Sequence, residues 1–173
     1  MRPPKPKDPH RSALMARVRQ KRTSPEKIVG TLLKSIGQFY RLNVRDLSGS
    51  PDFANRSRKW ALFVNGCYWH HHTNCRRATV PKTNEAFWRD KFGANRARDA
   101  RSVRVLRHAK FHVVIVWECE TADPEELRER LQRSLNRAAK SSRIIVVSSL
   151  IPVVPDQRVW APIDPPVSVS PVG

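Results

Sequence analysis

The chain has 173 residues, and its 33 Lys and Arg against 15 Asp and Glu give a formal net charge of +18 at pH 7. This length fits one domain with a modest core and tails, and this charge predicts a polyanionic partner, because solubility alone requires far less. With three cysteines and no long apolar run, we expect a protein of the reducing cytoplasm without a signal peptide or a membrane span.

The expected polyanion is nucleic acid rather than an anionic membrane. A membrane surface would require a clean basic amphipathic helix with a wide apolar face, and the chain contains none. Basic segments interleaved with aromatic residues instead suit phosphate contact combined with base stacking.

The first segment of the chain is basic and rich in proline. Residues 1–11 therefore predict a mobile basic arm. Residues 12–22 mix a few apolar side chains with several basic ones, which is typical of a short helix lying against phosphates. A solvated charged helix would have the same pattern.

A helix is predicted to begin after Thr23. Thr23 or Ser24 can cap it, and Pro25 fits its first turn. Apolar residues then recur at helical spacing until Gly37. In this context Glu26 is an N-terminal carboxylate that suits the helix dipole.

Strands are predicted in the next part of the chain. Apolar alternation indicates a half-buried strand at residues 39–46, and the continuous apolar run at residues 60–64 is typical of a central strand. A short extended piece begins at Asp52, directly after a turn. Its carboxylate could bind a hard cation beside the end of the central strand, or it could bond locally as turn residues do.

Residues 67–75 read Cys-Tyr-Trp-His-His-His-Thr-Asn-Cys, a mixture that no ordinary core segment needs. Cys67, Cys75 and one of the three histidines supply three ligands of a tetrahedral metal site. Cys119 ends the apolar run at residues 111–117 and completes the set if that run is a neighbouring strand. We therefore expect a structural zinc site, the alternative being that these thiols are small buried hydrophobes.

A long basic helix is predicted from about Glu85, capped by Thr83 or Asn84. Asn95 and Asp99 interrupt its apolar stripe, either because that part of the helix faces a cleft or because both side chains satisfy buried backbone groups. The stripe consists of Trp88, Phe92, Val103 and Leu106.

The final part of the chain carries one more predicted helix, from residue 124 to about 136. Residues 144–147 are β-branched and favour a strand, and the many prolines beyond them predict an irregular tail. We therefore predict a basic arm at 1–11, a folded domain at 12–140 and a proline-rich tail at 141–173.

Several motifs occur together in one order. They are Pro51-Asp52-Phe53, Asn65-Gly66-Cys67-Tyr68-Trp69-His70-His71-His72, Pro81-Lys82-Thr83-Asn84, Phe87-Trp88, Lys91, Asn95, Asp99 and Val116-Trp117-Glu118-Cys119. With them the chain resembles the very-short-patch-repair (Vsr) DNA mismatch endonuclease family from about Ser12 to Leu131.

The resemblance implies an α/β fold with a restriction-endonuclease-like core, a central mixed sheet flanked by helices. It implies an enzyme that uses Mg²⁺ to nick one strand 5′ to the thymine of a T:G mismatch, starting repair of deaminated 5-methylcytosine. Its partners would be mismatched duplex DNA and other repair proteins. We expect a monomer that is cytoplasmic and nucleoid-associated, with no membrane contact.

The resemblance also assigns site residues. Asp52 and the main-chain oxygen of Val64 would bind magnesium, His70 would be the base that activates water, and Glu26 would support that water from further away. The implied zinc ligands are Cys67, His72, Cys75 and Cys119. The implied DNA-binding residues are Met15 from the minor groove, Tyr68, Trp69 and Trp88 from the major groove, and Lys91 and Asn95 at the mispaired bases.

Two positions depart from the family pattern. Asn65 stands where a histidine is often found, and Tyr68 replaces the more usual phenylalanine. A second acid followed by lysine is absent after Asp52, which leaves His70 as the more credible base. Two alternatives stay open: a zinc-stabilised DNA-binding module without activity, and a related nuclease with a different target.

Overall fold

The structure is a computed structural model that describes residues 22–148. The predicted arm at residues 1–11, Met15 and the part of the predicted tail beyond Ser148 lie outside this range. The elements in chain order are α2 (Ser24–Ser35), β1 (Arg41–Leu42), β2 (Phe53–Asn55), β3 (Trp60–Asn65), α3 (Glu85–His108), β4 (His112–Trp117), the 3-10 helix η1 (Glu118–Ala122) and α4 (Pro124–Ser148).

The four strands form one mixed sheet in the order β1-β2-β3-β4. β2 pairs antiparallel with both β1 and β3, whereas β3 and β4 are parallel. The register places Asn65 beside Trp117. The carboxyl ends of the two central apolar runs therefore lie together at one end of the sheet.

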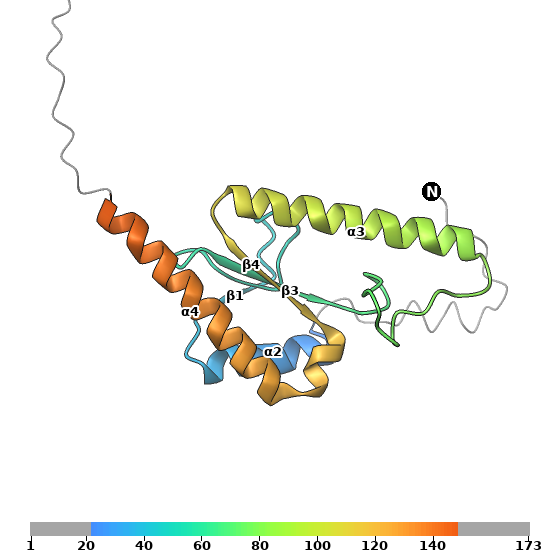
Figure 1. The fold of residues 1–173 in the computed structure, drawn as a ribbon, viewed down its shortest axis with the longest axis horizontal. Helices are drawn as coiled ribbons and strands as arrows, with labels where there is room; N and C mark the ends of the chain where they lie inside the picture. Colours follow the sequence, from blue (N-terminus) through green and yellow to red (C-terminus); the bar gives the residue numbers. More distant parts are fainter. Residues whose placement is uncertain (1–21, 149–173) are drawn as a thin grey trace, which may run out of the picture.

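Helices cover both faces of the sheet (Figure 1). α2 and α4 bury Leu33 and Leu131 against Trp60 and Val116 on one face. On the other face, Leu106 of α3 packs in a smaller cluster with buried residues of β2 and β3. The first half of α3 extends past the sheet, beside the segment that links β3 to α3.

The predicted strand at residues 39–46 is correct only at Arg41–Leu42. Asn43 adopts a positive φ of 48°, a conformation that asparagine tolerates better than most residues, and the chain turns there. Val44 is then buried while Leu42 is 53% exposed. The apolar alternation therefore spans a turn and not one strand face.

The three helices predicted from residue 24 onward are present, with one difference at the C-terminal end. The short helix predicted at residues 12–22 lies outside the described residues except for Arg22. Thr23 caps α2 with Glu26 in a capping box, and Asn84 precedes α3 in a left-handed conformation without a cap hydrogen bond. α4 continues to Ser148 instead of ending near residue 136. The strand preference at residues 144–147 was therefore wrong, because β propensity depends strongly on a neighbouring strand that this segment lacks.

Between residues 22 and 148, no helix is long and apolar enough to cross a membrane.

Candidate active site and metal centre

Asp52 and Val64 meet where β2 and β3 diverge. The ladder between these strands ends at the pair Phe53 and Leu62. Two residues further along β3, on the same side of the strand, the Val64 N–H donates to Asp52 Oδ2 at 2.7 Å. Because the N–H and the carbonyl of one strand residue lie on the same edge, the Val64 carbonyl faces the Asp52 side. A carboxylate and a carbonyl are oxygen ligands that suit a hard cation.

The environment of Asp52 disfavours its negative charge. The pKa of Asp52 is raised to about 6, mainly by burial and also by the nearby charge of Glu26, while the Val64 N–H and His70 oppose the shift. Two carboxylates and an imidazole therefore act on one another at this end of the sheet. A cation bound there would offset the cost of keeping Asp52 ionised.

Glu26 has local partners at the start of α2. Its Oε1 accepts hydrogen bonds from the Thr23 hydroxyl at 2.8 Å and the Thr23 N–H at 3.3 Å, and its Oε2 accepts from the Arg22 N–H at 2.8 Å. These contacts are those of the N-terminal carboxylate that helix signals predicted. Its negative charge also acts on Asp52 and helps to raise the pKa of that carboxyl.

His70 forms a short contact with Asp99 of α3, with 2.5 Å between Nδ1 and Oδ2. An aspartate on Nδ1 favours the tautomer that leaves Nε2 free to accept a proton. The sequence analysis named Asp99 as an interruption of the apolar stripe and among the motifs of the family resemblance, but it gave Asp99 no role in the site. Its spacing of four residues from Asn95, on the same helix face, was the available signal.

Asn95 holds the residue that precedes His70. Its Nδ2 donates to the Trp69 carbonyl at 2.9 Å, while its Oδ1 accepts from Arg98 Nη2 at 3.0 Å. The two partners fix the orientation of the amide. One turn of α3 therefore binds both Trp69 and His70. The explanation that the polar side chains satisfy backbone groups is correct for Asn95, whereas Asp99 pairs with an imidazole instead.

The predicted major-groove residues form one aromatic cluster. The Tyr68 ring centroid is 5.1 Å from that of Trp69 and 5.9 Å from that of Trp88. Lys91 Nζ lies 5.5 Å from the Trp88 centroid and 5.8 Å from that of Trp69. The structure thus brings together all the predicted DNA-binding residues except Met15, which it does not describe.

Cys67, His72, Cys75 and Cys119 form a group able to hold a metal ion, with ligand atoms all within 4.8 Å of one another. Cys67 follows β3 and Cys119 follows β4, so the parallel pairing of these strands brings them together. His72 Nδ1 lies 3.8 Å from Cys67 Sγ and 3.4 Å from Cys119 Sγ. His71 is turned away and stacks on Phe92.

The chemistry of this group fits a soft dication. Burial raises the pKa of Cys67 to about 12, so a thiolate at this position requires a cation beside it. Three thiols and one imidazole are a usual donor set for zinc. The surroundings also orient the ligands, since Glu118 accepts the Cys67 N–H at 3.3 Å and His72 stacks on Trp117.

Comparison with known proteins gives consistent matches. Residues 6–77 match the family described as DNA mismatch endonuclease Vsr. The chain is 45% identical over 126 residues to the type II nicking enzyme V.XorIIP of Xanthomonas oryzae pv. oryzae, covering 73% of this chain and 92% of the relative. It is 35% identical over 139 residues to the DNA mismatch endonuclease Vsr of Escherichia coli, covering 78% and 88%.

The four-residue Cys/His group makes a prediction about metal content. Protein dialysed against a mild chelator should retain about one zinc ion per chain, as tetrahedral thiolate sites do. His72→Gln should lose that ion because it removes one ligand, whereas His71→Gln, which alters the neighbouring histidine, should keep it. Elemental analysis of the two variants decides this, and equal zinc in both would contradict the ligand set.

The raised pKa of Asp52 makes a prediction about stability without divalent cations. The folded state binds this proton more tightly than the unfolded state, so stability falls as the pH rises from the ordinary pKa of 3.8 to about 6. At about pH 8, Asp52→Asn should therefore raise the free energy of unfolding by about 1–3 kcal/mol, at roughly 1.4 kcal/mol per pKa unit.

Urea unfolding in the presence of a chelator measures this effect. The exposed Asp90 provides a matched control, because Asp90→Asn should change stability by less than about 0.5 kcal/mol. The gain for Asp52→Asn should shrink as the pH approaches about 4, where the wild-type carboxyl is also neutral. A loss of stability at about pH 8 would show that the Val64 contact outweighs the cost of burial.

Proposed function

The chain belongs to the Vsr DNA mismatch endonuclease family and is therefore a DNA endonuclease, and from this membership we propose that it nicks one strand 5′ to the thymine of a T:G mismatch. The nick would start very-short-patch repair of deaminated 5-methylcytosine. The observation that best supports an active enzyme is the His70 and Asp99 pair beside Asp52. A DNA-binding module without activity would need no such oriented imidazole.

The proposed catalytic cation is magnesium, held by Asp52 and the Val64 carbonyl. When bound, it would polarise the phosphate and stabilise the negative charge that develops there. Asp52 must be ionised for this role, and its pKa of about 6 leaves it ionised at neutral pH. The oxygen-only character of this pair suits magnesium better than zinc.

His70 is the proposed general base. In this proposal water attacks the phosphorus and its proton passes to His70 Nε2, while the bond from phosphorus to the 3′ oxygen breaks and that oxygen takes a proton from solvent water. Asp99, 2.5 Å from Nδ1, would hold the ring in the required tautomer and stabilise the imidazolium that forms. Glu26 would add a negative charge that helps to orient the attacking water from the start of α2.

The Cys/His group would have a structural role in this enzyme. It joins the segment after β3 to the segment after β4, and its ligand His72 lies two residues from His70. Fixing that short segment would hold the proposed base near Asp52 without a direct part in the chemistry. A zinc-bound imidazole cannot also accept a proton, so His70 and His72 would have separate roles.

Mismatch recognition would rest on the aromatic cluster. Tyr68, Trp69 and Trp88 would wedge into the duplex from the major groove, with Met15 entering from the minor groove. Unstacking costs a few kcal/mol per step and least at a mismatch, so wedging itself favours mispaired DNA. Lys91 would contact the mispaired bases. Asn95 would also contact them, through the second hydrogen of its amide NH₂ group, because the first is donated to the Trp69 carbonyl.

The proposal extends to the architecture and setting of the protein. We assign the mixed sheet and its flanking helices to a restriction-endonuclease-like core, within a domain at residues 12–140. The protein would act as a cytoplasmic, nucleoid-associated monomer together with other repair proteins. A related nuclease with another target is the second candidate, because the relatives include proteins named type II nicking enzymes.

A nicking assay tests this function. Purified protein with magnesium, given end-labelled duplexes with every mismatch in varied flanks, should cut T:G duplexes 5′ to the thymine. Asp99→Asn should lower the rate by about 10²–10⁴, the usual range for removing an oriented general base, whereas His71→Ala should retain most activity. Equal cutting of matched and mismatched duplexes would favour the second candidate.

The wedge makes a separate prediction about binding. Trp69→Ala should weaken T:G duplex binding by about 1–3 kcal/mol, the scale of one stack between a base and an aromatic ring. Binding to matched duplex, which rests mainly on phosphate contacts, should barely change. Phe39, which is 78% exposed and outside the aromatic cluster, provides the control substitution Phe39→Ala.

Affinities for both duplexes, melting temperature and zinc content should be measured together on the Trp69 variant. If Trp69 were instead a core residue, its replacement would cost about 3–5 kcal/mol of folding stability. A destabilised variant that binds both duplexes equally poorly would refute the wedge.

A further inference from the structure

The C-terminal end of α3 carries a hollow with basic walls. It has a volume of about 560 Å³ and is lined by Ala100, Val103, Arg104, Arg107, His108 and Lys110. No acidic residue occurs in the sequence between Asp99 and Glu118. Within residues 22–148, none of Arg104, Arg107 and Lys110 forms an ion pair.

Cations from other elements approach the same place. The Lys59 carbonyl accepts the His112 N–H at 2.7 Å, and Lys59 Nζ lies 4.8 Å from the Phe111 ring centroid, so Lys59 lies beside the start of β4. Burial lowers the pKa of His112, and the charges of Arg107 and Arg137 lower it further. Positive charge from α3, α4 and the turn before β3 therefore converges on this end of the sheet.

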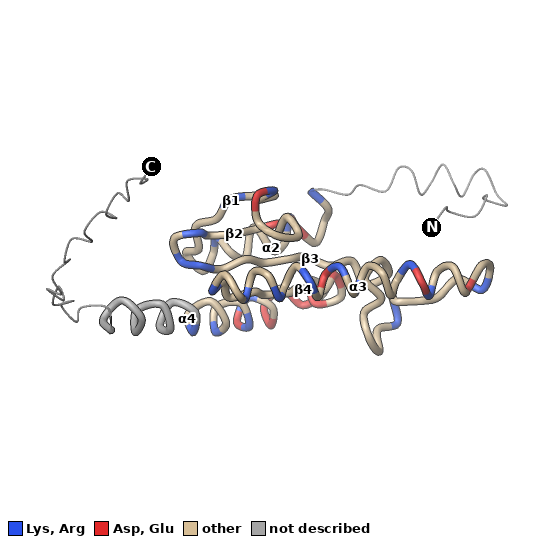
Figure 2. Tube along the Cα trace, turned by 90° about the horizontal axis from the view of Figure 1, so that it is seen from above, with Lys and Arg blue, Asp and Glu red and all other residues tan. Residues whose placement is uncertain are grey.

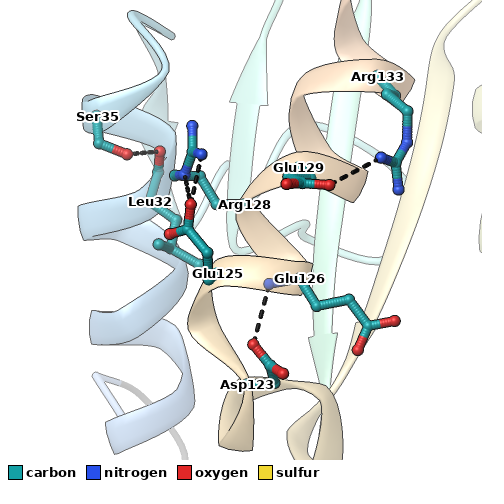
Figure 3. A network of polar contacts seen from close by, with 8 residues as sticks. All are labelled: Leu32, Ser35, Asp123, Glu125, Glu126, Arg128, Glu129 and Arg133. Atoms are coloured by element: carbon teal, nitrogen blue, oxygen red, sulfur yellow. Dashed lines mark hydrogen bonds and ion pairs between the residues drawn. The ribbon is translucent and has the colours of Figure 1, made fainter.

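The charges on α4 are arranged differently. Arg128 pairs with Glu125 and Arg133 pairs with Glu129 (Figure 3). Basic and acidic segments lie close together along this part of α4, whereas basic segments recur along α3 (Figure 2). Arg128 and Arg133 of α4 are therefore paired within the protein, whereas the cations of the α3 hollow are available to an outside anion.

Helix stabilisation explains only part of this arrangement. Cations in the last turn of a helix are favourable by about 0.3–1 kcal/mol each, and Arg107 and His108 occupy the last turn of α3. Arg104 lies before that turn, and Lys59 and Arg137 belong to other elements. Their mutual repulsion is unfavourable in the free protein and would be relieved by a polyanion.

The hollow is separate from the candidate active site. Asp52 and His70 lie at the carboxyl ends of β3 and β4, whereas Lys59 precedes β3 and His112 begins β4. Along α3, Arg107 lies about 12 Å beyond Asp99, at 1.5 Å per residue. The phosphates that would contact Asp52 and His70 are therefore not those that this hollow could reach.

We infer that the basic surface formed by Lys59, Arg104, Arg107 and Lys110 binds DNA phosphates outside the mismatch site. These are either the flank of the nicked duplex or a second duplex. The surface would add sequence-independent affinity and so retain the enzyme on DNA while it searches for a mismatch. This inference deepens the proposed function, because it names a further DNA contact of the same enzyme.

The salt dependence of binding to matched duplex tests the surface. Each phosphate contact adds about 0.9 to the slope of log K against log salt, so Arg104→Gln with Arg107→Gln should make the slope shallower by about 2. The matched control, Arg128→Gln with Arg133→Gln, removes the same charge from paired arginines of α4 and should leave the slope unchanged. Arg104→Lys with Arg107→Lys, which keeps both charges, should retain most of the slope.

Two further measurements, the dependence of the slope change on duplex length and the bridging of two labelled duplexes, identify the source of the phosphates. A slope change seen only on a long duplex assigns the contact to the flank, and loss of bridging between two labelled duplexes assigns it to a second molecule. Equal slopes for the α3 and α4 variants, with melting temperatures unchanged, would overturn the inference. Because matched duplex is used, failure of T:G nicking would leave this test intact.

Discussion

The parallel pairing of β3 with β4 is the constraint on which the candidate site depends. It places Asn65 beside Trp117, so the segments that follow the two strands begin at the same end of the sheet. Cys67 and Cys119 can then approach one ion although 52 residues separate them in sequence. An antiparallel pair would have sent these segments to opposite ends and left each thiol without the other.

The segment that follows β3 also directs its three consecutive histidines to different partners. His70 pairs with Asp99, His71 stacks on Phe92, and His72 faces the thiols. A positive φ of 47° at His71 turns the chain between its two neighbours, which allows adjacent imidazoles to point in different directions. The proposed base and the proposed metal ligand can therefore lie two residues apart without competing for the same proton.

Much of this arrangement was predictable from local pattern. Apolar runs indicated β3 and β4, helical spacing indicated α2 and α3, and the composition of residues 67–75 indicated a metal group. The partner of His70 was not predictable in this way, because Asp99 lies 29 residues away and only the packing of α3 brings it close. The turn at Asn43 and the full length of α4 were also missed, since both depend on surroundings that local propensity does not describe.

The central claim is that Asp52 and His70, with His70 oriented by Asp99, act on one phosphate, that on the 5′ side of a mispaired thymine. A crystal structure with a T:G duplex and calcium in place of magnesium tests it most directly. We expect a cation on Asp52 and the Val64 carbonyl, and His70 Nε2 within hydrogen-bond reach of a water in line with that phosphorus. A phosphate bound elsewhere, or His70 turned away from it while still paired with Asp99, would contradict the claim.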